Sequence, residues 1–287
     1  MEQHPPQPIY VCGATASGKS EHAVRLATEL GGEIVNADAF QLVRGLEVLS
    51  AAPSAEERTM VPHHLYGVIE PRALMDAGRY LALAKPVIEG IQGRGKVPIV
   101  TGGSGLYLKF LSHGPSDLPQ ADAALRAELD STPLDELVAE LRRLDPTEAS
   151  RTALENRRYV SRAIEICRLS GQRASDLRDR WAEKHASRDS ELRGVWIQRS
   201  RPELHRRIGL RTKAMLEHGA VQEVEAIANT ASDTCRKAIG FAEILALLAG
   251  EIDRPACEDF INAATRQYAK RQETWFRREP WLRPLVM

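Results

Sequence analysis

Eight residues near the N-terminus have the types and the spacing of a phosphate-binding loop. Residues 13–20 are GATASGKS and match the pattern G-x-x-x-x-G-K-[S/T]. In such a loop, backbone N–H groups at a helix start cradle phosphate oxygens. Lys19 would neutralise their charge and Ser20 would hold a Mg²⁺ ion. The predicted phosphate contacts are Gly13, Ala14, Thr15, Ala16, Ser17, Gly18, Lys19 and Ser20.

A carboxylate follows the next predicted strand. Residues 33–36 are a strand candidate, and Asp38 comes directly after it. Ligands of parallel α/β sheets bind at the carboxyl ends of the strands, so we expect Asp38 and Lys19 to face the same crevice. Taken alone, an Asp after a strand is more often a turn cap than a catalytic group.

Other features narrow the chemistry. The chain has no N-K-x-D segment to read guanine, and no apolar strand ends in the carboxylate that normally assists magnesium in ATPases. The four cysteines form no C-x-x-C pair, which disfavours a disulfide framework or a zinc site and favours a reducing cytoplasm. His63 and His64 are neighbours on a strand candidate, point to opposite sides and are predicted to make structural hydrogen bonds.

Composition is that of an ordinary globular protein. The 287 residues are 43% hydrophobic and 27% charged, and the formal net charge is zero. No apolar run approaches the length of a membrane span, and the N-terminal MEQHPPQP has no signal-peptide pattern. Basic residues nevertheless cluster at 157–162, 199–213 and 265–283. Such clusters are either solvated helix faces or patches for a polyanion.

The elements that would position these residues change character along the chain. Strand candidates at 8–12, 33–36, 64–69 and 97–101 alternate with helices, which predicts a parallel sheet. After residue 113 a loop at 114–119 leads into amphipathic helices from 121 to about 185. Residues 195–198 resemble a return strand, with further helices to the C-terminus. We therefore predict an α/β core like that of P-loop NTPases, from residues 1–112 and 193–287, and an all-helical insertion at 113–192.

Several segments together resemble one family over nearly the whole chain. In order they are GATASGKS (13–20), NADAFQLVRGLEVLSAAPSAEE (36–57), VPHHL (61–65), VPIVTGGSGLYLKFL (97–111), RAIEICRLSG (162–171) and RQYAKRQETWFRRE (266–279). The chain is similar in these to the tRNA dimethylallyltransferases, which are tRNA-modifying prenyltransferases. It departs from the family's pattern at Tyr159 and Lys237, each of which replaces an arginine.

The resemblance implies transfer of a dimethylallyl group from dimethylallyl diphosphate to the N6 amine of the adenosine beside the anticodon of tRNA, with release of pyrophosphate. It implies Asp38 as the general base, and Lys19, Ser20 and Lys237 at the diphosphate, with Mg²⁺ as cofactor. A cytoplasmic monomer that binds no membrane is expected. The implied tRNA contacts, some of them in the helical insertion, are Asp38, Ala39, Phe40, Gln41, Ser104, Arg126, Arg158, Tyr159, Val160, Ser161, Arg162, Arg271 and Arg277.

Three other functions remain open on the residues alone. An enzyme that prenylates a free adenine nucleotide would need the same loop and base but not the basic helices. A small-molecule kinase would use the loop to bind ATP. A non-catalytic RNA-binding protein would not need an intact Gly18-Lys19-Ser20 together with Asp38.

Overall fold

The computed structural model describes residues 5–115 and 117–287, so Ser116 of the expected loop and the first four residues of the N-terminal segment lie outside it. The chain forms two compact units. The first joins Met1–Ser112 to Ser190–Met287, and the second is His113–Asp189. The sequence had placed the insertion at 113–192.

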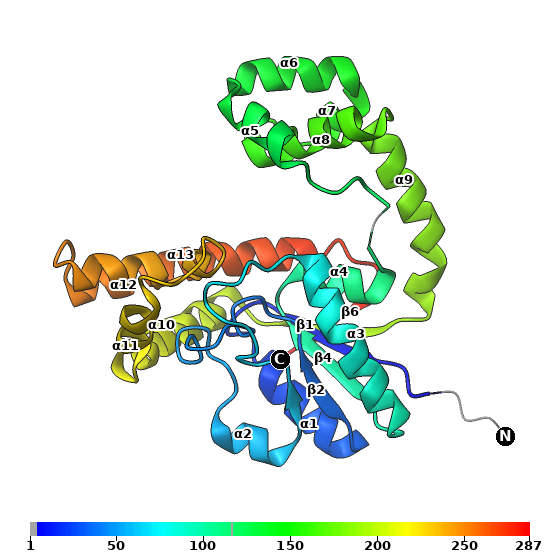
Figure 1. The fold of residues 1–287 in the computed structure, drawn as a ribbon. Coiled ribbons are helices and arrows are strands. Elements are labelled where there is room, and N and C mark those ends of the chain that lie inside the picture. Colours follow the sequence, from blue (N-terminus) through cyan, green and yellow to red (C-terminus); the bar gives the residue numbers. More distant parts are fainter. Residues whose placement is uncertain (1–4, 116) are drawn as a thin grey trace. The chain divides into compact units, whose positions relative to one another are not determined.

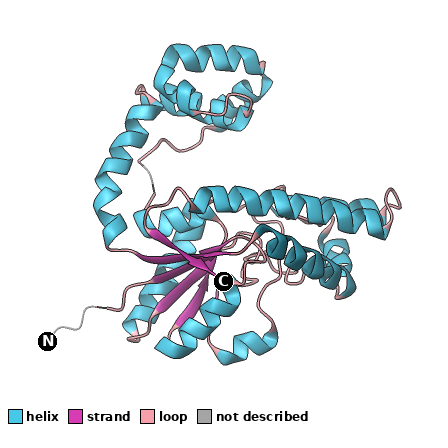
Figure 2. Ribbon diagram, turned by 180° about the vertical axis from the view of Figure 1, so that it is seen from behind, coloured by secondary structure: helices cyan, strands magenta, loops and turns pink. Residues whose placement is uncertain are grey.

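The first unit is built on a parallel six-stranded sheet, drawn in magenta in Figure 2. Its strands are β1 (Ile9–Gly13), β2 (Glu33–Asn36), β3 (His63–His64), β4 (Pro98–Gly102), β5 (Arg193–Gln198) and β6 (Leu282–Val286), in the order β3-β2-β4-β1-β5-β6. The parallel sheet predicted from the alternating elements is confirmed. β1 lies between β4 and β5, so its carboxyl end, where the phosphate loop begins, is at a topological switch point.

Helices cover both faces of this sheet, and alternating strand residues enter two cores. Tyr10, Cys12 and Val100 pack with α3 (Ala77–Gly93), α4 (Gly105–His113) and the end of α13 (Arg254–Phe276). Val11, which precedes Cys12, and Ile99, which precedes Val100, point to the other face and pack against α1 (Lys19–Leu30). Burial on both faces explains why these strands are continuously apolar.

The C-terminal helices of the first unit, whose ribbons are labelled in Figure 1, enclose a third core. It joins α10 (Arg201–Glu217), α11 (Ala220–Ile227), the 3-10 turn η2 (Cys235–Lys237), α12 (Phe241–Leu248) and the start of α13. The loop after β2 contributes Val43, Leu46 and Leu49 to this core and then enters α2 (Ala55–Met60). The core therefore fixes that loop against α10 and α12.

The second unit is entirely helical, as predicted. It contains α5 (Ala123–Ser131), α6 (Leu134–Leu144), α7 (Pro146–Arg151), α8 (Arg157–Ser170) and α9 (Ala174–His185), followed by η1 (Ala186–Ser190). Its core includes Leu137, Leu141 and Ile164.

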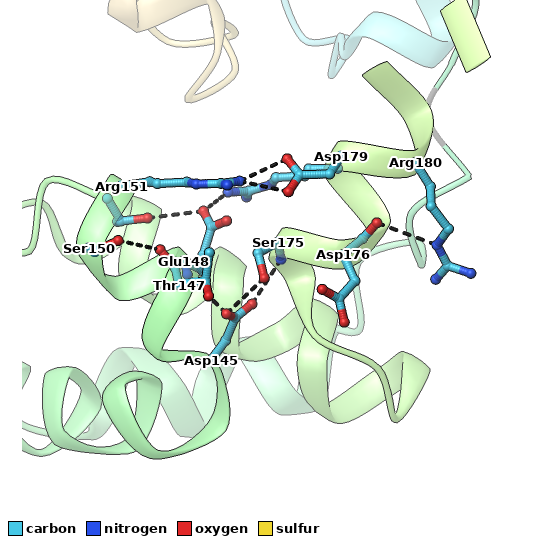
Figure 3. A network of polar contacts seen from close by, with 11 residues as sticks. Asp145, Thr147, Glu148, Ser150, Arg151, Ser175, Asp176, Asp179 and Arg180 are labelled. Atoms are coloured by element: carbon cyan, nitrogen blue, oxygen red, sulfur yellow. Dashed lines mark hydrogen bonds and ion pairs between the residues drawn. The ribbon is translucent and has the colours of Figure 1, made fainter. Parts of the chain in front are cut away.

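A buried carboxylate joins two of these helices (Figure 3). Asp145 Oδ1 accepts from the backbone N–H of Glu148 at 2.9 Å, which caps α7. Its Oδ2 accepts from the N–H of Ser175 at 2.8 Å, at the start of α9. Glu148 also pairs with Arg178, and Arg151 with Asp179. One side chain thus supplies acceptors to two helix N-termini, which would otherwise leave N–H groups unpaired.

The predicted strands differ from the observed ones in two places. The third strand is only His63–His64, because the chain after it turns at Leu65 and Gly67, both with positive φ, and pairs with Val43 only at Ile69. The last strand, β6, was not predicted. It is a short edge strand that contains Pro284, and most of its residues are exposed, so it has no buried apolar pattern to detect.

The structural roles expected for the two histidines are confirmed. His64 Nε2 pairs with Glu33 at 2.7 Å and His63 Nδ1 lies 2.8 Å from the carbonyl of Val61, so both histidines are structural. All four cysteines are free and buried. Within the described part of the chain, no helix is both long and apolar enough to cross a membrane.

Candidate active site

The phosphate loop forms the tight turn between β1 and α1. Ala16 has φ 62° and Gly18 has φ 93°, so two loop residues adopt the left-handed conformation. An alanine there is strained, and such strain is typical of functional turns. The loop uses some of its donors internally, because Ser17 N–H donates to the carbonyl of Ala14 at 3.1 Å. The amides at the N-terminus of α1, around Lys19 and Ser20, are those suited to an anion.

Lys19 lies in the loop with 8% of its surface exposed. Its Nζ is 3.5 Å from the carbonyl of Ala14. Burial lowers the pKa of this ammonium, Asp38 partly opposes that effect and Arg211 adds to it. These three charged groups therefore lie close enough to interact electrostatically.

Asp38 is held by the residue two positions earlier. The buried Asn36 side chain accepts from the N–H of Asp38 at 2.8 Å and donates to its carbonyl at 3.1 Å. Tyr80 Oη donates to the carbonyl of Asn36 at 2.8 Å. Asp38 Oδ1 accepts from the N–H of Phe40 at 3.2 Å, so the carboxylate does cap a turn. Its half-buried side chain nevertheless also lines a cavity.

That cavity lies entirely in the first unit and combines polar and apolar walls. Asp38 and Arg211, from the loop after β2 and from α10, supply its charged groups, and Thr15 of the phosphate loop supplies one of its hydroxyl groups. The remaining wall is largely aliphatic and aromatic. Its other lining residues are Phe40, Leu49, Ser50, Ile208, Thr212, Met215, Ala238, Ile239, Thr265 and Tyr268. A small apolar group and a charged group could both be accommodated there.

Three arginines on or just before α10 contact the phosphate loop. Arg199 Nε donates to the carbonyl of Ser17 at 2.6 Å, and Arg207 Nε donates to that of Ala16 at 2.9 Å. Arg211 Nη1 donates to Thr15 Oγ1 at 2.9 Å. Burial lowers the pKa of Arg211, and nearby Asp38 opposes the effect. This cluster was expected to be either a solvated helix face or a patch for a polyanion, and its contacts with the phosphate loop were not predicted. The i, i+4 spacing from 207 to 211 was the available signal.

Lys237, which was expected at the diphosphate, directly precedes two residues of the cavity wall in the sequence. Its side chain is exposed in η2, and the neighbouring Ala238 and Ile239 line the cavity instead. Arg211 of α10 does line the cavity. It contacts Thr15 of the phosphate loop, from which it is separated by 196 residues of sequence. The diphosphate contact of Lys237 stays a prediction, and Arg211 is a second candidate for it.

The loop after β2 is fixed by side chains that hold its backbone. Gln41 Nε2 donates to the carbonyls of Ser50 and Ala51 at 3.2 and 2.9 Å. Glu223 accepts from the N–H groups of Val48 and Leu49 at 2.8 and 2.9 Å. Gln41, which was expected to contact tRNA, is buried, and its side-chain amide donates to backbone carbonyls of the protein.

The other predicted tRNA contacts of the first unit lie near the cavity or on α13. Ser104 Oγ accepts from the N–H of Ala39 at 3.0 Å, so these two residues are joined. Phe40 lines the cavity. Arg271 and Arg277 are exposed on and at the end of α13, and the guanidinium of Arg271 lies 5.7 Å from the ring centre of Tyr268.

In the helical unit, the predicted contacts from 158 to 162 occupy the first turns of α8. Arg158 and Tyr159 are exposed, whereas Val160 is fully buried in the core. The side chain of Val160 is thus a core residue and not an RNA contact, because position 160 faces inward on the helix. Among the described residues, the hydroxyl of Ser161 is buried without a hydrogen-bond partner.

Two further predicted contacts of this unit share one acceptor. Arg126 and Arg162 both pair with Glu165, whose side chain is 2% exposed. Arg162 also donates to the carbonyl of Pro119 at 2.7 Å. These pairs orient both guanidinium groups and partly neutralise them.

The residues present fit a magnesium ion that is bound jointly with a phosphate. In the part of the chain that the structure describes, no three acidic, histidine or cysteine side chains gather into a metal cage. Mg²⁺ bound to phosphates commonly takes only one or two protein oxygens and keeps several waters. The hydroxyl of Ser20, in the first turn of α1, suits that arrangement, and the buried hydroxyl of Ser17 has no protein partner among the described residues.

The family model and the related proteins that match this sequence point to the same family. A model of the family described as IPP transferase matches residues 41–279. The tRNA dimethylallyltransferase of Akkermansia muciniphila is 44% identical over 279 residues, which cover 96% of this chain and 92% of that protein. That of Anaeromyxobacter dehalogenans strain 2CP-1 is 41% identical over 285 residues, with coverages of 96% and 92%.

Solved structures agree with the sequence relatives. The full-length tRNA isopentenylpyrophosphate transferase of Bacillus halodurans superposes with a TM-score of 0.71 at 29% identity, over 99% of this chain and 90% of that one. A eukaryotic dimethylallyltransferase acting on tRNA gives a TM-score of 0.79 at 26% identity, with coverages of 98% and 74%. The chain belongs to the IPP transferase family.

Proposed function

We propose that this protein transfers the dimethylallyl group from dimethylallyl diphosphate to the exocyclic N6 amine of the adenosine adjacent to the anticodon in tRNA, and releases pyrophosphate. The observation that carries the proposal is that one cavity holds Asp38 and Arg211 beside Thr15 of the phosphate loop, with aliphatic walls. Family membership and relatives that act on tRNA support the same activity.

The phosphate loop would stabilise the leaving group. When the allylic carbon–oxygen bond breaks, both electrons stay with the diphosphate, whose negative charge grows. Lys19, Arg211 and the amides at the start of α1 are fixed before the reaction and would stabilise that charge without reorganisation. A magnesium ion held by Ser20 and the phosphates would supply further charge neutralisation.

Asp38 would act on the acceptor. The adenine N6 amine is a weak nucleophile because its lone pair is delocalised into the ring. As the new nitrogen–carbon bond forms, the amine loses a proton, which the Asp38 carboxylate accepts. Asn36 holds the backbone of Asp38 on both sides, so the base stays oriented. General-base help of this kind contributes about 100- to 10,000-fold in rate.

Binding the tRNA would require exposed cations and a target base taken out of its stack. Arg271 and Arg277 on the first unit, and Arg158 on the helical unit, are exposed and suited to phosphate contacts. The uncharged Tyr159, also exposed, is suited to stacking on a base.

The decisive experiment follows both products. An anticodon stem-loop RNA with adenosines beside the anticodon is incubated with the protein, magnesium and dimethylallyl diphosphate. We expect pyrophosphate release and a mass gain of one dimethylallyl group on the RNA, with no need for ATP.

The same assay separates the alternatives. Free AMP should be a much poorer acceptor, because binding energy from the stem is needed to hold the unstacked base at the allylic carbon. Strong turnover on AMP would favour a prenyltransferase of free nucleotides. ADP formed from ATP would favour a kinase, and RNA binding without any turnover would favour a non-catalytic RNA-binding protein.

A further inference from the structure

One buried glutamine on α13 contacts two loops of the site at once. Gln272 is 5% exposed. Its Oε1 accepts from the backbone N–H of Thr15 at 2.8 Å, across 257 residues of sequence. Its Nε2 donates to the carbonyl of Gly103 at 2.9 Å. Both hydrogen bonds are buried, so loss of either partner would leave a buried polar group unsatisfied.

The second of these loops continues to the base. Ser104, next to Gly103, donates its N–H to the carbonyl of Ala37 at 3.2 Å and accepts from the N–H of Ala39 at 3.0 Å. These bonds flank Asp38 on both sides. The chain of contacts from Thr15 through Gln272 and Ser104 therefore links the phosphate loop to the segment that carries the carboxylate.

Close packing leaves this linkage little freedom. A Cβ atom added at Gly103 would lie 2.1 Å from Gln272 Nε2, and one added at Gly105 would lie 2.5 Å from the Trp275 ring. At Gly102 it would lie 2.1 Å from the carbonyl oxygen of Ala37. The Gly-Gly-Ser-Gly turn therefore fits between α13 and the Asp38 loop only because three of its residues lack side chains.

Tyr268, one turn before Gln272 on α13, lies on the cavity side of that helix. Burial raises the pKa of its phenol, and the nearby Asp38 adds to the effect. Tyr268 and Asp38 both line the cavity. The network thus reaches the place where the acceptor base would lie.

We propose that Gln272 is a positioning residue that sets the distance between the diphosphate held by the phosphate loop and the base Asp38. The inference rests on the proposed function, in which the allylic carbon must meet an amine whose proton goes to Asp38. Without Gln272 the two loops would be fixed to the sheet separately. A misplacement of about 1 Å between reacting groups costs on the order of 100-fold in rate.

The test compares Gln272→Met with Gln267→Met. The first variant keeps the length of the side chain but neither donates nor accepts its two hydrogen bonds. The second makes the same change at an exposed position of the same helix. We expect Gln272→Met to lower the single-turnover transfer rate about 10- to 100-fold. The affinities for inorganic pyrophosphate and for the stem-loop RNA should stay within a few-fold of the wild type, and Gln267→Met should match the wild type throughout.

A second measurement tests, without any catalysed reaction, whether Gln272 holds the phosphate loop and the Gly103–Ser104 turn together. Hydrogen exchange at the backbone amides of Thr15 and Ser104, followed by NMR, should accelerate in Gln272→Met. In Gln272→Glu the carboxylate still accepts from Thr15 but cannot donate to Gly103. That variant should therefore protect the Thr15 amide while the Ser104 amide exchanges faster.

The outcomes separate this inference from the proposed function. A wild-type transfer rate in Gln272→Met, or wild-type exchange at both amides, overturns the positioning role. So does a rate loss matched by equal losses of pyrophosphate and RNA affinity, which indicates a general folding defect. If the wild type itself transfers no dimethylallyl group, the proposed function fails, and the exchange rates alone decide whether Gln272 couples the two loops.

Discussion

Clustered arginines of the two units have different kinds of hydrogen-bond partner. Arg199, Arg207 and Arg211 turn inward, and donate to two carbonyls and a hydroxyl of the phosphate loop. In the helical unit Arg126 and Arg162 share the buried carboxylate of Glu165. The first set donates to neutral acceptors of the phosphate loop, whereas the second is paired with an acidic side chain of the protein itself.

The difference shows that the partner of an arginine decides its function. A guanidinium that donates to carbonyls keeps its positive charge unbalanced and available to a phosphate. One that pairs with a carboxylate mainly orders its own helix. The following experiments test this contrast between arginines that donate to neutral acceptors of the phosphate loop and arginines that are paired with a carboxylate in the insertion.

The largest effect is expected from removing the carboxylate of Asp38, which interacts with Arg211. Asp38→Asn should lower single-turnover transfer by about 100- to 10,000-fold, because the nearly isosteric amide cannot accept the amine proton. Pyrophosphate affinity should change little or rise. The exposed Asp259→Asn serves as the control. Transfer within a few-fold of wild type would falsify the general-base role.

Next in size is the loss of an inward arginine. Arg211→Met should lower kcat/KM for dimethylallyl diphosphate on the order of 100-fold, as for loss of one fixed donor at a developing negative charge. Arg206→Met, on the same helix but exposed and paired with Glu203, should leave it unchanged. Lys237→Ala should have a much smaller effect than Arg211→Met. If Lys237→Ala lowered kcat/KM more than Arg211→Met, Lys237 and not Arg211 would be the main diphosphate contact.

A change in the helical unit should alter stability rather than chemistry. Burial favours a raised pKa for Glu165. Hydrogen bonds from Arg162 and from the N–H of Asp122 oppose this effect, as do the positive charges of Arg162 and Arg126. Together they hold the pKa of Glu165 below its ordinary value of 4.5. A lowered native pKa means that this stabilisation is present above pH 4.5 and is lost as the pH falls through the native value.

Glu165→Gln should therefore destabilise α5 and α8 by about 1–3 kcal/mol at neutral pH and flatten their acid response. Hydrogen exchange of peptides from residues 119–170 measures both effects. Glu136→Gln, exposed on α6, is the matched control. An unchanged acid response in Glu165→Gln would show that another carboxylate controls it.

The smallest effect is expected from an exposed arginine of the insertion. Arg158→Ala should weaken stem-loop binding modestly and make its salt slope shallower by about one unit, if the side chain contacts one phosphate. Arg143→Ala, also exposed on the helical unit, should leave the slope unchanged. Equal slopes for Arg158→Ala and the wild type would make Arg158 a solvated surface residue.

Much of the architecture was readable from local patterns. The phosphate loop at 13–20 is continuous in sequence, and both the turn and the helix start that it needs are encoded within it. Asp38 could be placed because the carboxyl ends of parallel strands meet at one edge. The change from alternating elements to helices alone marked the insertion near residue 113, because helical periodicity is a local property.

What the sequence did not reveal depends on contacts between distant segments. Gln272 meets Thr15 across 257 residues and Arg211 meets it across 196, and neither position carries a local pattern that names its partner. Val160 was counted with its exposed neighbours because their motif is contiguous, although the helix turns it into the core. β6 was missed because an exposed strand with a proline lacks apolar alternation.

The sequence by itself therefore determined which groups could do chemistry, namely the loop, Lys19, Ser20 and Asp38. The tertiary structure decided which of the arginines face that loop, which face a carboxylate, and which glutamine spans the two loops. Backbone turns and helix periodicity arise from neighbouring residues, whereas the direction of a long side chain is set by the nearest partner that satisfies its donors in the folded chain.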